Sequence, residues 1–152
     1  MADSTIQVTI EKWVRENWLP AHYDGQVFRK LHVELNTEAR GKFEFDAVSQ
    51  DKSIIANIST SNATTSGGNP ASAKMQKLRS DMLFLLMASA RKKLVVLTEQ
   101  DMFDLCEKEK SNGRIPDEIE FVYANGMPEN LQKLLIEAKR IAAREVTPEV
   151  RL

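Results

Sequence analysis

The stretch that decides the fold is residues 42–60, which read KFEFDAVSQDKSIIANIST. Apolar side chains alternate with polar ones on both sides of a short Gln-Asp-Lys segment, and this is the pattern of two β-strands joined by a tight turn. We predict strands over residues 42–49 and 53–60. The two strands then form a β-hairpin in the first half of the chain, with an acidic residue near the end of its first strand.

The alternation also assigns side chains to faces of this hairpin. Because successive side chains of a strand point to opposite sides, Phe45 and Ala47 are expected on one face of the first strand and Asp46 on the other. By the same rule Asn57 and Ser59 share a face of the second strand. The hairpin therefore presents a carboxylate, an amide and a hydroxyl as its candidate functional groups.

The rest of the chain predicts alternating helices and strands around this hairpin. Helical periodicity predicts helices over residues 5–18, 71–90, 99–110 and 128–145. Short apolar or alternating runs predict further strands over residues 27–35, 93–98 and 118–124. Pro20 is expected to end the first helix. The fold class is α/β, with a mixed sheet that begins as an antiparallel three-strand meander and continues in parallel where helices cross over.

Length and composition set broad limits on function. A chain of 152 residues with 42% hydrophobic and 28% charged residues is expected to form one domain, residues 1–152. Its net charge of -1 creates no global basic field that would announce nucleic acid. The lone Cys106 excludes an internal disulfide and is expected to be buried. No signal peptide or membrane span is expected, because the longest apolar run, residues 82–90, is too short, so the predicted compartment is the cytosol.

The order of elements, with Asp46 in the second strand and a hairpin leading to the third, resembles the PD-(D/E)XK nuclease-like superfamily, which has the restriction-endonuclease-like fold. The resemblance covers residues 5–125. It implies that Asp46 matches the family aspartate and that Asn57-Ile58-Ser59 occupies the place of the acid-x-Lys motif. It also implies that Glu11 or Glu16 supplies the acid of the first helix. In that family these groups bind a divalent metal, Mg²⁺ or Mn²⁺, and activate water.

The sequence departs from the family motif at its two remaining positions. A hard cation prefers carboxylate oxygens, whereas Asn57 offers a neutral carbonyl. Ser59 lacks the positive charge of a lysine, and phosphoryl chemistry depends mainly on electrostatic stabilisation of its transition state. Some family members carry the lysine on the following helix, where Lys74 and Lys77 stand here.

A migrated site would combine these lysines with Asp46, with Glu44 on the same strand face, and with Glu11 or Glu16. The alternative is that these charges form an ordinary solvated surface.

Three functional hypotheses remain open from the sequence. The first is a nuclease-like domain that no longer cleaves, needs no cofactor, and binds DNA or RNA weakly or serves in assembly or regulation. The second is an active, divergent nuclease that uses Mg²⁺ or Mn²⁺ and the migrated lysine. The third is a protein-interaction domain, whose partner could be a second copy of the chain. The polar loop at residues 60–70 lacks the P-loop pattern, although its hydroxyls and amides could contact a phosphate backbone.

Overall fold

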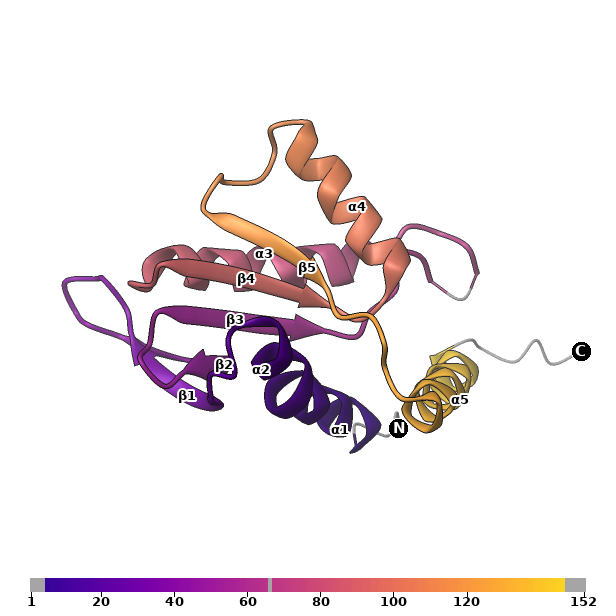
Figure 1. Ribbon diagram of the computed structural model, residues 1–152. Coiled ribbons are helices and arrows are strands. Elements are labelled where there is room, and N and C mark those ends of the chain that lie inside the picture. The colour runs from indigo at the N-terminus through magenta and orange to yellow at the C-terminus, as the bar shows by residue number, and fades with distance from the viewer. Residues whose placement is uncertain (1–4, 66, 147–152) are drawn as a thin grey trace, which may run out of the picture.

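The computed structural model describes residues 5–65 and 67–146 and contains a five-stranded sheet flanked by helices (Figure 1). The strands are β1 (Phe28–Glu34), β2 (Lys42–Ser49), β3 (Ile54–Ser59), β4 (Lys92–Leu97) and β5 (Ile119–Tyr123). The helical segments are α1 (Thr5–Trp13), the π-helix η1 (Val14–Trp18), α2 (Leu19–His22), α3 (Ser72–Met87), α4 (Gln100–Ser111) and α5 (Glu129–Val146).

The sheet has the strand order β1-β2-β3-β4-β5. The first three strands pair antiparallel, whereas β3 pairs with β4 and β4 with β5 in parallel. Each parallel pair is connected through a helix, α3 or α4, as parallel strands require. The predicted element order and the mixed α/β sheet are therefore confirmed.

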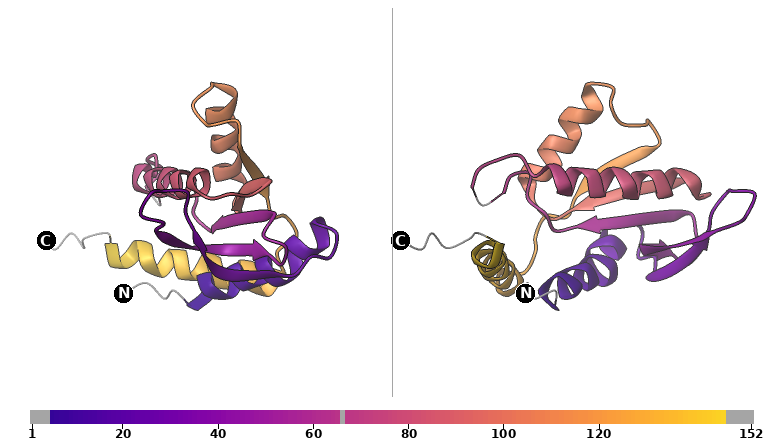
Figure 2. Two further views of the ribbon diagram at one scale, coloured as in Figure 1. Left: turned by 90° about the vertical axis from the view of Figure 1, so that its left-hand side faces the viewer. Right: turned by 180° about the vertical axis from the view of Figure 1, so that it is seen from behind.

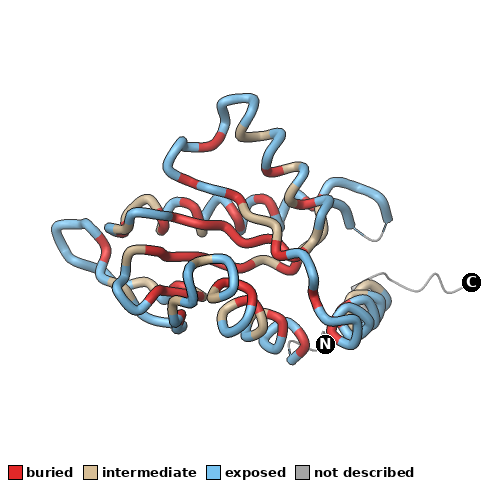
Figure 3. The backbone as a smooth tube through the Cα atoms, in the orientation of Figure 1, coloured by how far each residue is buried: buried red, intermediate tan, exposed pale blue. Residues whose placement is uncertain are grey.

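Two layers of apolar side chains cover the two faces of the sheet. In Figure 3 the strands of the sheet carry runs of buried residues. One core packs α3 and α4 on the face that carries Ile55 and Val95. The other packs η1 on the face that carries Ala56 and Val96. β4 is buried on both faces, which explains its continuous apolar sequence. Cys106 belongs to the first core and is fully buried, as predicted.

The first helix does not end before Pro20, so that prediction is wrong. The Leu19 N–H bonds to the Val14 carbonyl, five residues back, which makes the segment Val14–Trp18 a π-helix. Pro20 then falls in the first turn of α2, where a backbone N–H is not needed for a helical hydrogen bond. Proline is therefore tolerated, and the helical path continues to His22.

The predicted faces of the first hairpin strand are also wrong beyond Phe45. From Arg29 to Leu31 β1 advances two residues, while its partners on β2 run from Val48 to Phe45, so β2 carries one extra residue at this point. Such a bulge reverses the side-chain alternation. Phe45 consequently packs in the α3 core, whereas Ala47 packs in the η1 core on the opposite face.

The turn between β2 and β3 is held by Asp51. Its Oδ1 accepts hydrogen bonds from the Ser49 hydroxyl at 2.8 Å and from the Ser53 hydroxyl and backbone N–H at 2.7 and 3.0 Å. Led by the Ser53 bonds, these interactions lower the pKa of Asp51 to about 2. Lys52 adopts a left-handed conformation (φ 61°) that closes the turn. The tight turn predicted from the sequence is therefore present.

α3 and α5 differ in detail from their predicted extents and faces. α3 ends at Met87 rather than at residue 90, because Ala88 is extended and leads toward β4. α5 packs on α1 through a small third core that contains Leu131 and Leu135. Figure 2 shows α5 crossing near α1, at one end of the molecule.

Leu134 and Ile141, two apolar residues of α5, are 54% and 41% exposed. No helix in the described ranges is long and apolar enough to span a bilayer.

Candidate functional site

Asp46 occupies the point at which β2 and β3 separate. The ladder between these strands pairs Val48 with Ile55 and Ala47 with Ala56. Beyond these pairs, the hydrogen bonds between the two strands involve side chains. The Asp46 Oδ2 accepts a hydrogen bond from the Ile58 N–H at 2.8 Å. The Asp46 N–H in turn donates to the Asn57 Oδ1 at 3.4 Å. The bulge therefore opens the sheet and holds one carboxylate in the opening.

The π-helix contributes a cation to the same point. Arg15 lies in η1, and its Nη1 donates to the Asp46 carbonyl at 3.1 Å. A π-turn widens the helix and changes the direction of the residues in it, and such turns occur often at functional sites. Sequence reasoning did not identify Arg15. The signal that could have found Arg15 is Pro20, which follows it by about a turn and a half. A proline at that point of a helical segment indicates that the helix is irregular there.

Two further carboxylates lie close enough to Asp46 to interact with it electrostatically. Burial is the main cause that raises the pKa of Glu11 on α1 and of Asp81 on α3, and the charge of Asp46 raises both further. Burial also raises the pKa of Asp46 itself, against the lowering effects of the Ile58 hydrogen bond and of nearby cations. The site thus gathers three acids from two helices and a strand on either side of the sheet.

Asp81 was missed by sequence reasoning. It is the single acidic residue of α3 and stands four residues after Lys77, so it shares a helix face with that lysine. The Lys77 Nζ lies 3.7 Å from the Asp81 Oδ2. A lone acid on a helix whose first half is basic was the available signal.

Lys77 is the predicted lysine that the structure brings to the site. Its charge acts on Glu11, Asp46 and Asp81, and in each case it lowers the pKa of the carboxyl. Its side chain is 74% exposed, so the ammonium group remains accessible from solvent. Lys30 on β1 acts on Asp46 in the same direction. The site therefore contains cations beside partly buried acids.

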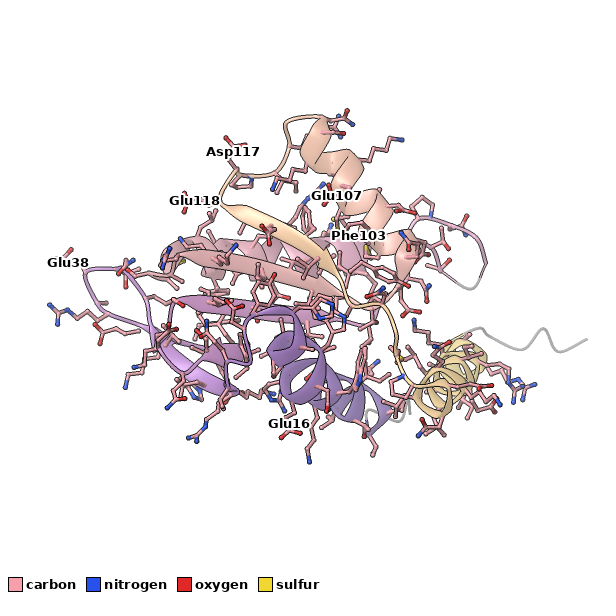
Figure 4. All side chains as sticks on the ribbon, in the orientation of Figure 1. Glu16, Glu38, Phe103, Glu107, Asp117 and Glu118 are labelled. Carbon is pink, nitrogen blue, oxygen red and sulfur yellow. The ribbon has the colours of Figure 1, made fainter. Side chains whose placement is uncertain are left out.

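The other two predicted acids, Glu44 and Glu16, make their closest charged contacts away from Asp46. Glu44 forms an ion pair across the β1–β2 ladder with Lys30 at 3.6 Å, and its other carboxylate oxygen lies 3.5 Å from the His32 Nδ1. Glu16 is 51% exposed and 4.0 Å from Lys12, and Figure 4 shows it at the outer edge of the N-terminal helical segment. Of the two candidate acids of the first helix, Glu11 is the one that interacts with Asp46.

Asn57 and Ser59, which the resemblance places at the acid-x-Lys positions, are held by the protein itself. Asn57 is 3% exposed, and its Oδ1 already accepts the Asp46 N–H, while its Nδ2 is buried without a partner in the described part of the chain. The Ser59 Oγ accepts a hydrogen bond from the Ser61 N–H at 3.2 Å. Both side chains act here as local braces of the strand end.

A divalent metal does not fit this donor set as it stands. Across residues 5–65 and 67–146, no three side chains from Asp, Glu, His and Cys converge closely enough to hold one ion. Mg²⁺ is bound chiefly by carboxylate oxygens. Asp46 is the one strand residue at the opening that provides them, because Asn57 and Ser59 are neutral. The geometry shows acids that interact with one another and does not show a metal centre.

Lys74 lies one turn before Lys77 and lines a cleft of about 720 Å³. We call this the α3–α5 cleft. It is bounded by the start of α3, the loop at residues 60–71, Gln7 of α1 and the C-terminal half of α5. Gln7 is one helical turn before Glu11, and Thr60 follows Ile58 by two residues. The cleft therefore adjoins the Asp46 site along three elements.

Comparisons of the chain with protein-family models, with curated proteins and with solved structures found no match.

Proposed function

We propose that this chain is a restriction-endonuclease-like domain that binds nucleic acid and has lost phosphodiester cleavage. The observation that carries the proposal is the opening between β2 and β3, where Asp46 is retained beside cations while Asn57 and Ser59 are engaged in the protein's own hydrogen bonds. The element order and the mixed sheet agree with this class of fold.

The loss of cleavage follows from the charges of the site. Catalysis of phosphoryl transfer depends on positioned charge that is stronger toward the transition state than toward the substrate. Asn57 contributes no charge, and its oxygen already holds the Asp46 N–H. Ser59 contributes none either. A site with one strand carboxylate lacks most of the stabilisation that the family motif provides.

Binding is supported by the cations that surround the opening. Lys77 and Lys30 are exposed, and Arg15 is fixed against the Asp46 carbonyl. Because the whole chain has a net charge of -1, we expect few phosphate contacts and weak binding. With two or three contacts, the logarithm of the binding constant should fall with the logarithm of salt concentration with a slope of about -2 to -3.

The test measures binding and cleavage on the same samples. Fluorescence anisotropy with labelled single-stranded DNA, double-stranded DNA and RNA over a salt series gives the affinity and the slope. Replacing Lys77 with Gln should weaken binding and reduce the slope by about 1. Lys133→Gln is the matched control, because that lysine is 74% exposed on α5 and pairs with Glu129. An absence of binding at low salt would refute the proposal.

Cleavage is tested with plasmid and RNA substrates in Mg²⁺ and in Mn²⁺. The proposal expects no product above the level of the Asp46→Ala variant. Metal-dependent cleavage that disappears in Asp46→Ala would instead establish the active-nuclease hypothesis.

The active-nuclease hypothesis is favoured by one specific observation, the position of Lys77. Its charge reaches all three carboxyl groups of the site, as a lysine that has moved from strand to helix would. Under this hypothesis Lys77→Ala abolishes cleavage and Lys74→Ala does not, because Lys74 lines the neighbouring cleft. Equal loss in both variants would argue against the migrated lysine.

A protein-interaction role is favoured by exposed apolar residues of α5: Leu134 and Ile141, which share one side of the helix, are 54% and 41% exposed, and Ile136 on another side is 67% exposed. Sedimentation of the chain over a concentration range tests self-association. A concentration-independent monomer would exclude the second copy as its partner.

A further inference from the structure

The α3–α5 cleft exists because small residues face each other across it. The half of α5 that extends past its contact with α1 presents alanines to the cleft, including Ala138 and Ala142. The opposite wall is formed by Pro70 and Ala71. These side chains are too short to close the gap, so a largely apolar cleft of about 720 Å³ remains. This volume lies within the range of about 300–1,000 Å³ that is common for small-molecule sites.

One side of the cleft carries polar groups without partners. Thr60 is 8% exposed and lines the cleft, and its hydroxyl makes no hydrogen bond within the described residues. The Thr60 hydroxyl is therefore free to exchange a hydrogen bond with a ligand atom that enters the cleft. Thr60 directly follows β3 and therefore has a rigid strand behind it.

The cleft is also lined by a positive charge. Lys74 lines the cleft and forms no ion pair or hydrogen bond with its side chain in the part of the chain that the structure describes. It stands in the first turn of α3, which has no acidic residue and no side-chain cap. The partial positive charge of a helix N-terminus adds to that of the lysine. An anionic group is thus favoured beside Lys74.

The second lysine of the cleft is already neutralised. The Lys139 Nζ bonds to the Asn62 Oδ1 at 2.6 Å and to the Glu99 Oε1 at 3.1 Å. This arrangement fixes the loop onto α5 and leaves one unpaired cation, Lys74, at one end of an apolar wall. Complementary ligands have one negative group and an apolar body.

From this geometry we infer that the α3–α5 cleft binds a small amphiphilic anion, a carboxylate with an alkyl chain. The carboxylate bonds to Lys74 and to the Thr60 hydroxyl, and the chain lies along the alanines of α5. A nucleotide fits less well, because no aromatic side chain that could stack on a base lines the cleft in its described part. The inference is independent of nucleic-acid binding at Asp46.

The test is a calorimetric titration of the full chain with decanoate, with decanol as the uncharged probe and acetate as the probe without a chain. We expect decanoate to bind most tightly and acetate not to bind measurably. Lys74→Gln should weaken decanoate binding about tenfold and leave decanol binding unchanged, because it removes one charge-assisted contact. Lys133→Gln is the matched control and should bind decanoate as the wild type does.

Thr60→Val separates a ligand contact from a structural role. Because the hydroxyl has no partner in the protein, its removal should not lower the stability of the ligand-free chain, yet it should weaken decanoate binding about fivefold. Ala142→Trp fills the cleft and should abolish binding of both chain-bearing probes. The control Ala39→Trp places the same side chain on the exposed β1–β2 turn and should bind decanoate normally.

Three results would overturn the inference. They are an absence of decanoate binding at millimolar concentration, wild-type affinity in both Lys74→Gln and Ala142→Trp, and displacement of decanoate by a short single-stranded oligonucleotide. The last result would assign the cleft to the path of a nucleic acid.

Discussion

Replacing Asn57 with Asp measures the free-energy cost of placing a second carboxylate in the opening between β2 and β3. The substitution keeps the shape of the side chain and exchanges the unpartnered Nδ2 for an oxygen. Packing is therefore unchanged, and any loss of stability is electrostatic. Asn57 is 3% exposed, so the new carboxylate would be formed almost without water and next to Asp46. A buried charge without a partner costs about 3–5 kcal/mol.

The sign of the pH dependence follows from this cost. Burial and the charge of Asp46 both raise the pKa of the new carboxyl in the folded state. The folded chain then binds its proton more tightly than the unfolded chain does, so stability is lost as the pH rises through the folded pKa. We expect the variant to lose about 3 kcal/mol at pH 8 and about half of that at pH 5.

Urea denaturation of wild type, Asn57→Asp and the uncharged control Asn57→Ala at both pH values measures this difference. Magnesium or manganese ions should restore stability in Asn57→Asp alone, by about 2.7 kcal/mol when free ion exceeds its Kd a hundredfold. Equal stability of Asn57→Asp at pH 5 and pH 8 would refute the view that this opening is desolvated.

Three further measurements follow from the pKa shifts and from the packing. The raised pKa values of Glu11, Asp46 and Asp81 mean that wild-type stability falls as the pH rises above about 4 through those values, and Asp46→Asn should flatten this slope in urea titrations. Burial raises the pKa of Cys106 to about 12, so Ellman's reagent at pH 8 should react with it only after unfolding. Leu131→Ala should cost about 2–5 kcal/mol and speed amide exchange in α5, and unchanged exchange there would contradict the α1–α5 packing.

Local signals in the sequence were sufficient for the elements and for the topology. Alternation over residues 42–49 and the unbroken apolar run of β4 gave the right strands, because each pattern reports how many faces of a strand are buried. The crossover helices then required parallel pairing. A local pattern could not predict the bulge at Asp46, since an extra residue is defined only relative to the neighbouring strand.

Local patterns are equally unable to predict which residues belong to the site. Glu11 and Glu16 are equivalent by composition, and only the packing of the first helical segment in the folded chain separates the acid that interacts with Asp46 from the one that pairs with Lys12. Asp81 reaches the site from the opposite side of the sheet, a relation that no spacing in the sequence encodes.

The position of Lys77 bears on the choice between the two nuclease-like hypotheses, one without cleavage and one with the lysine on the helix. An ion pair at 3.7 Å with one exposed partner contributes about 1 kcal/mol or less, so Asp81 does not lock Lys77 in place. The ammonium group can therefore turn toward a phosphate beside Asp46 at little cost. Asn57 has no such freedom, because it is buried and braces the Asp46 N–H. Under the active-nuclease hypothesis, the second carboxylate must consequently come from Glu11 or Asp81, and the helices rather than the hairpin would carry the chemistry.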